Sequence, residues 1–152
     1  MVKRPNKTPD PGLRSARLGL AGWVVPGLTH WLIGQRGRGA IFFVCITATF
    51  WTGVAVGGAY TTLGDPENRP WLIAQIGAGG NVVAGLVLGN KIVTPRMAKA
   101  DYTYRSYWPA SDIGIVYTAV AGLLNVLVIL DGLVRADRML APETAGAERG
   151  GR

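Results

Sequence analysis

The sequence predicts an all-α integral membrane protein: a small bundle of three transmembrane helices plus one short N-terminal helix that is kinked or re-entrant. Two observations lead to this class. Only 16% of the 152 residues are charged, against roughly a quarter in an ordinary soluble domain. In addition, 83 residues fall in four stretches without any charge: 18–35, 39–64, 70–90 and 113–130. A soluble helix needs polar residues along its wet face, and these stretches leave no room for one.

Three of the predicted helices are long enough to cross a bilayer, which takes about 20 apolar residues. They are 40–60, 71–91 and 113–134. The fourth apolar segment, 18–33, offers only 16 residues and has Pro26-Gly27 near its centre, where proline removes a helical hydrogen bond. We expect this segment to form either a short kinked span or a re-entrant hairpin.

Two polar tails flank a single membrane domain at 18–138. Residues 1–17 carry five basic residues and three prolines, so we expect a disordered basic arm. Residues 139–152 are rich in Gly, Ala and Glu, and we expect a second disordered tail there. The excess of Lys and Arg in the arm places the N-terminus in the cytoplasm, whereas the side of the C-terminus depends on whether 18–33 crosses the bilayer.

The net charge of +7 raises the question of a polyanionic partner. The basic residues line the ends of apolar blocks, with no aromatic platform around them. That pattern is typical of attraction to a lipid bilayer with anionic headgroups. It disfavours nucleic acid as a partner, because basic residues alone, without a recognised binding domain, do not indicate nucleic-acid binding.

Small residues recur every four positions in the last two predicted spans. Such a stripe lets a second helix approach closely, and a buried Asn can hydrogen-bond across the contact. We therefore expect these two helices to pack together, with Asn81 and Asn125 facing the interior. The alternative is a polar pathway or small-ligand site lined by the two asparagines. The residues concerned are Gly77, Asn81, Gly85 and Gly89 in one helix and Gly114, Thr118, Gly122 and Asn125 in the other.

Asp131 is the only acid close to a predicted span interior, where a carboxylate is a functional candidate by default. Arg135 follows it one helical turn later, in the favourable order for an ion pair. We therefore favour an interfacial ion pair over a proton carrier. His30 is the sole histidine, and neither thiols nor carboxylates at ligand spacing surround it. The sequence indicates no metal site, no cofactor site and no catalytic residue.

Residues 26–39, PGLTHWLIGQRGRG, are followed by Ala-Ile-Phe-Phe and resemble the turn of small bacterial membrane proteins related to the two-transmembrane-helix domain family. Thr29 stands where that family usually has glycine and Trp31 where it has tyrosine. The acidic-arginine motif of its eukaryotic members is absent. Residues 117–131 resemble the last helix of an uncharacterised bacterial family that shares this turn. The resemblance implies a bacterial protein with a tight interfacial turn, and it implies no reaction. The turn residues are Pro26, Gly27, His30, Gly34, Arg36 and Gly39.

We therefore expect a multi-pass protein of a bacterial cytoplasmic membrane that is not an enzyme. Its expected role is that of a structural or accessory subunit, acting through glycine-striped helices on a membrane-protein partner or as a homo-oligomer. The alternative is a small transporter or channel component that works as an oligomer. A membrane enzyme is disfavoured because no acid, base and nucleophile converge in the sequence.

Overall fold

The computed structural model describes residues 11–58, 62–63, 69–92 and 109–149. Within these residues the regular structure is helical and no strand is present, so the predicted all-α class is confirmed. The helices are α1 (Pro11–Val24), α2 (Leu28–Leu32), α3 (Arg36–Gly57), α5 (Arg69–Ile76), α6 (Gly80–Ile92) and α8 (Pro109–Arg149).

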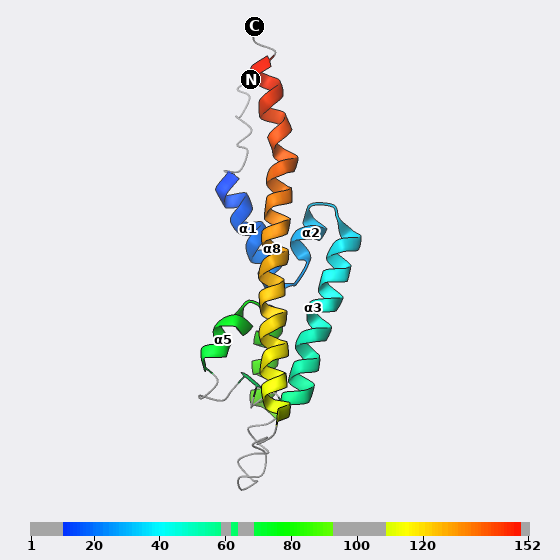
Figure 1. The fold of residues 1–152 in the computed structure, drawn as a ribbon. Coiled ribbons are helices and arrows are strands. Elements are labelled where there is room, and N and C mark those ends of the chain that lie inside the picture. The colour runs from blue at the N-terminus through cyan, green and yellow to red at the C-terminus, as the bar shows by residue number, and fades with distance from the viewer. Residues whose placement is uncertain (1–10, 59–61, 64–68, 93–108, 150–152) are drawn as a thin grey trace.

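Two long helices, α3 and α8, lie side by side and run in opposite directions (Figure 1). Both are long and apolar enough to cross a membrane, over Arg36–Gly57 and Pro109–Met139. Only 28% and 44% of their most apolar windows are buried inside the molecule, so much of their apolar surface faces outward. An exposed apolar surface of this extent is typical of contact with lipid or with another protein, which supports a membrane location.

The first apolar segment reverses direction at Pro26-Gly27. Helix α1 ends at Val24, Gly27 has a left-handed φ of 79°, and α2 runs back toward the end from which α1 came (Figure 1). Glycine adopts this φ without the steric cost of a Cβ atom, and proline leaves the preceding helix one hydrogen bond short. Helices α1 and α2 therefore form a short hairpin rather than one continuous helix.

The segment predicted as one span over 71–91 is divided, and this expectation is wrong. Helix α5 ends at Ile76 and α6 begins at Gly80. Between them the backbone makes i to i+3 turn bonds, including Gly79 N–H to Ile76 C=O at 3.0 Å, and Gly79 has a φ of 58°. Three glycines within four residues weaken the helix at this point, since each costs about 1 kcal/mol relative to alanine. The described residues thus contain two long apolar helices rather than three.

The two hairpins, α1–α2 and α5–α6, enter the molecule from opposite ends, and their tips meet part-way along α3 and α8 (Figure 1). The tips touch through Trp23 and Val24 on one side and Gly79 and Gly80 on the other. A small apolar core lies beside this junction. It contains Ile46, Phe50, Val54, Leu63, Ala78, Val82, Ala121 and Val128.

Both predicted tails differ from expectation where the structure describes them. Helix α1 begins at Pro11, so 11–17 are helical, and proline is favoured at the first helical position because its missing N–H would have no partner there. Helix α8 continues to Arg149, past the expected boundary at 139. Residues 1–10 of the predicted arm and 150–152 of the predicted tail lie outside the described residues.

Candidate functional site

Glycines let α3 and α8 approach until their backbones touch. A Cβ atom built on Gly114 of α8 would lie 2.6 Å from the Cα of Gly57 and 2.7 Å from the carbonyl oxygen of Gly53, both in α3. Farther along α8, a Cβ on Gly122 would overlap the carbonyl of Ala74 in α5, and one on Gly77 would lie 2.5 Å from the carbonyl oxygen of Gly122. Helix α8 therefore uses its glycine stripe on two neighbours, α3 and the end of α5.

A buried polar cluster lies between these two glycine contacts. The Gln75 amide nitrogen donates to the carbonyl of Thr62 at 3.0 Å and to the hydroxyl of Thr118 at 2.9 Å. Thr118 lies one turn from the carbonyl of Gly114, which its hydroxyl approaches to 3.0 Å. Gln75 and Thr62 are 1% exposed and Thr118 is 0% exposed, so this cluster joins α5 to α8 away from solvent. Thr118 was predicted as a packing residue from its spacing, whereas Gln75, the only Gln in the uncharged stretch 70–90, was not predicted.

Asn125 of α8 connects both hairpins. Its side-chain nitrogen donates to the carbonyl oxygen of Gly22 in α1 at 3.3 Å and to that of Gly77, just after α5, at 2.9 Å. The residue is fully buried. Carbonyls near the end of a helix lack an intrahelical partner, and Asn125 supplies one to each hairpin. Its own side-chain oxygen has no hydrogen-bond partner among the described residues.

The hairpin tips also bind each other directly. The indole N–H of Trp23 donates to the carbonyl of Ile76 at 2.9 Å, across 53 positions of sequence. The carbonyls of Trp23 and Val24 press against Gly79 and Gly80, where a Cβ atom would overlap them. The C-terminal end of α1 thus faces the N-terminal end of α6. These ends carry opposite partial charges, so the contact is electrostatically favourable.

A second polar cluster lies toward the other end of α8. Arg135 Nε donates to Asp131 Oδ2 at 2.7 Å, which is the predicted ion pair, and His30 Nε2 lies 3.1 Å from the same oxygen. His30 is fully buried, whereas the Asp131 side chain is 43% exposed. Since a carboxylate only accepts hydrogen bonds, we assign the proton to His30 Nε2. This contact spans 101 residues and was not predicted, because the sequence spacing shows only the pair within α8.

The buried ring of His30 lies between α3 and α8. It packs edge-to-face on Phe42 of α3, with the ring centroids 5.0 Å apart. Gly132 of α8 lies close enough that a Cβ there would stand 3.3 Å from His30 Cε1. The neighbouring Thr29 donates its hydroxyl to the carbonyl of Leu18 at 2.9 Å, which closes the α1–α2 hairpin. His30 Nδ1 has no partner within the described part of the chain.

The turn between α2 and α3 owes its shape to three glycines. Gly34 has a left-handed φ of 88° and ends the short helix α2. Gly27 and Gly39 touch backbone to backbone, and Gly39 lies under the indole of Trp31, so neither position has room for a Cβ atom. The turn therefore presses α2 against the first turns of α3, with Pro26 buried beneath and Arg36 exposed as the first residue of α3.

The remaining predicted residues lie on α6. Gly85 faces Leu63 and Phe50, where a Cβ would lie 2.6 Å from Leu63 Cδ1. Asn81 is half-buried, and its side-chain nitrogen has no partner in the described ranges, so it does not bond with Asn125. The break at Gly77–Gly79 explains this, because it interrupts the face on which Gly77 and Asn81 would otherwise align. Gly89 lies in a part of α6 whose surroundings are not described.

Together these clusters bind two facing hairpins to a pair of long apolar helices. Among the described residues, no group of three or more His, Cys, Asp or Glu is placed to hold a metal ion. The fold and its polar clusters define an all-helical protein with two helices able to cross a membrane. The chain belongs to a family of unknown function, DUF6677, whose model matches residues 17–143. No curated protein and no solved structure matches it.

Proposed function

We propose that the chain is a multi-pass protein in which α3 and α8 cross the bilayer, while the hairpins α1–α2 and α5–α6 enter from opposite faces and return. Irregular backbone at membrane depth is tolerated only where protein or water satisfies its polar groups. Both hairpin tips fulfil this condition, since Trp23 and Asn125 donate to carbonyls at the ends of α1 and α5. Helix α3 has 22 residues, or about 33 Å at 1.5 Å per residue, which suits a hydrocarbon core of about 30 Å.

The distribution of charge supports a cytoplasmic N-terminus. The start of α1, the turn before α3 and the end of α8 lie toward one end of the molecule (Figure 1). The segments that adjoin this end carry eleven of the 16 Lys and Arg residues, and those that adjoin the other end carry five. Cytoplasmic loops are enriched in basic residues, so this end faces the cytoplasm. The assignment to a bacterial cytoplasmic membrane rests on the resemblance of 26–39 and 117–131.

A reporter fused after Arg138 tests this arrangement. With two crossings, the C-terminal side of α8 returns to the cytoplasm, so a cytoplasmic reporter should be active and an exported one inactive. A fusion in the segment after Gly57 serves as the control and should give the opposite result. An exported signal after Arg138 would show that the chain crosses an odd number of times and would refute the two-crossing arrangement.

Within the membrane we propose a non-catalytic structural or accessory role. The observation that carries it is the use of the buried amide side chains: Asn125 and Gln75 each donate to a backbone carbonyl of another segment, as does the more exposed indole N–H of Trp23. These groups hold helices together, and the outward faces of α3 and α8 are left for lipid or a partner. Purification in mild detergent should then yield a partner at fixed stoichiometry. A homo-oligomer that conducts ions after reconstitution would contradict this role.

One observation favours a second candidate, a transporter or channel component. Discontinuous helices that meet near the bilayer midplane form binding sites in many transporters. Here the hairpin tips meet at Asn125, whose buried oxygen has no partner among the described residues. Ion flux into liposomes that is lost in Asn125→Leu and retained in Thr52→Val, an exposed position of α3, would establish this candidate. Absence of flux in the folded wild-type protein would remove it.

A further inference from the structure

An apolar groove of about 300 Å³ opens on the outside of the molecule between the first hairpin and α3. Its lining includes Pro26 at the hairpin tip, Trp31 of α2, and Ala40, Phe43 and Val44 of α3. Trp31, Phe43 and Val44 are exposed, so the groove is accessible from the surroundings. None of the polar clusters described above uses it.

The walls of the groove are held rigidly. Gly27 and Gly39 touch backbone to backbone, and the Trp31 indole rests on Gly39. Gly39 is itself buried, one turn inside α3. A concave apolar site that is already formed before its ligand arrives loses little conformational entropy on binding, which increases its affinity for a ligand of matching shape.

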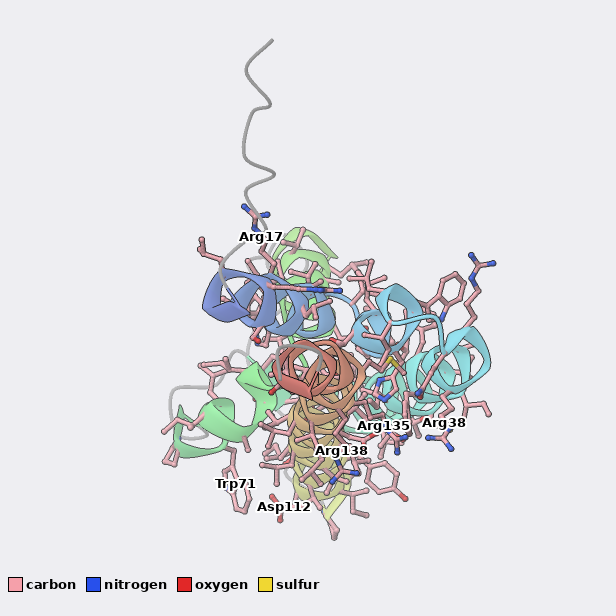
Figure 2. The ribbon with its side chains drawn as sticks, turned by 90° about the horizontal axis from the view of Figure 1, so that it is seen from above. Arg17, Arg38, Trp71, Asp112, Arg135 and Arg138 are labelled. Carbon is pink, nitrogen blue, oxygen red and sulfur yellow. The ribbon has the colours of Figure 1, made fainter. Side chains whose placement is uncertain are left out.

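Positive charge lies at one end of this groove. Arg36 lies four, seven and eight residues before Ala40, Phe43 and Val44, which places it on the same face of α3 as the groove. No acidic residue lies in this first turn. Arg38 comes two residues after Arg36, a rotation of about 200° around the helix, so it lies on the face of α3 away from the groove. Both arginines are exposed, and Figure 2 shows Arg38 at the outer edge of α3.

We propose that the groove binds one acyl chain of an anionic phospholipid, whose phosphate is held by Arg36. The proposal rests on the membrane location proposed above. Guanidinium groups bind phosphate through charge-assisted hydrogen bonds, and an indole such as that of Trp31 favours the headgroup level. A partner helix is the competing occupant. It would have to bring its own carboxylate to Arg36, whereas an anionic lipid combines the apolar chain and the negative charge in one molecule.

The test titrates the full-length protein, purified in mild detergent, with phosphatidylglycerol or phosphatidylcholine of identical acyl chains, and counts bound lipid by native mass spectrometry. The wild-type protein should retain phosphatidylglycerol more strongly. The variant Arg36→Gln should lose roughly fivefold of that affinity, since it removes the one basic residue on the groove face. Val44→Trp should fill the groove and weaken both lipids. Glycerol phosphate, which has no acyl chain, should not compete.

The matched control is Arg38→Gln, which removes the same charge from the same turn of α3 on the face away from the groove. Equal loss of phosphatidylglycerol in Arg36→Gln and Arg38→Gln would overturn the proposal, and so would equal affinity of the wild type for the two lipids. A Val44→Trp variant that loses a protein partner or a second copy, while lipid binding is unchanged, would assign the groove to a helix instead. Failure of the membrane location itself is recognised separately, by recovery of the protein in the soluble fraction of cells.

Discussion

Replacement of Gly114 by alanine tests whether backbone contact holds α3 and α8 together. The new Cβ atom would lie 2.6 Å from Gly57 Cα, 2.7 Å from the Gly53 oxygen and 2.9 Å from Gly57 N. All three are backbone atoms of a helix and cannot move like the end of a side chain. Ordinary van der Waals contact begins at 3.4 Å, so the two helices would have to separate locally by roughly 0.8 Å.

The expected cost follows from two opposing effects. Overpacking of a tight contact destabilises by about 1–3 kcal/mol. Alanine in a helix interior is about 1 kcal/mol more favourable than glycine, which offsets part of this cost. Gly19→Ala in α1 is the matched control, because its Cβ would lie at an ordinary 3.8 Å from Leu133 Cδ1. The propensity gain is shared, so Gly114→Ala should be less stable than Gly19→Ala by about 1–3 kcal/mol.

The assay is equilibrium unfolding in mixed micelles of a mild detergent and dodecyl sulfate, followed by helical circular dichroism. Gly114→Ala should unfold at a lower fraction of dodecyl sulfate than the wild type, and Gly19→Ala at an equal or higher one. If the two variants unfolded together, the contact between Gly114 and α3 would not contribute as the geometry requires, and close approach of these helices could not be the main source of their association.

Three further substitutions probe the hairpins. Asn125→Leu removes both hydrogen bonds to the hairpins and should lower the free energy of unfolding by about 1–3 kcal/mol. Amide hydrogen exchange should accelerate in both 22–28 and 74–82, and acceleration in only one of these segments would contradict a shared anchor. Gly27→Ala would give a residue with a Cβ atom a φ of 79° and would press that atom against the backbone of Gly39. Its melting temperature should therefore fall well below that of Gly19→Ala, and equal melting temperatures would refute the strained turn. Asp131→Asn keeps an oxygen that can accept from His30, whereas Asp131→Leu does not, so the leucine variant should melt at the lower temperature.

Hydropathy predicted the all-helical class but did not predict where a helix is interrupted. The uncharged stretch 70–90 has the length of a span, and its apolar content is unaffected by the glycines at 77, 79 and 80. The break depends on backbone freedom at those glycines and on what the freed groups then bind. The glycines were visible in the sequence, but Trp23, which bonds to the carbonyl of Ile76, comes from another hairpin.

For the polar residues, too, contacts within one helix could be predicted and contacts between segments could not. The pair of Asp131 and Arg135 could be predicted, because a spacing of four is a property of one helix. Asn125 was expected inside the bundle, but its bonds to Gly22 and Gly77 depend on where two separate hairpins end. The contact between His30 and Asp131 likewise depends on how the first hairpin packs against α8.

By itself, the sequence determined that the protein is helical, that its apolar blocks need an apolar environment, and that the first block breaks at Pro26-Gly27. These properties are local or compositional, since they follow from side-chain hydropathy and from the backbone chemistry of proline and glycine. Only the tertiary structure decided that the third block is a hairpin, that the two hairpins meet tip to tip, and that Asn125 binds both. Those outcomes depend on which freed carbonyl finds a donor from a distant segment, and no local pattern encodes that pairing.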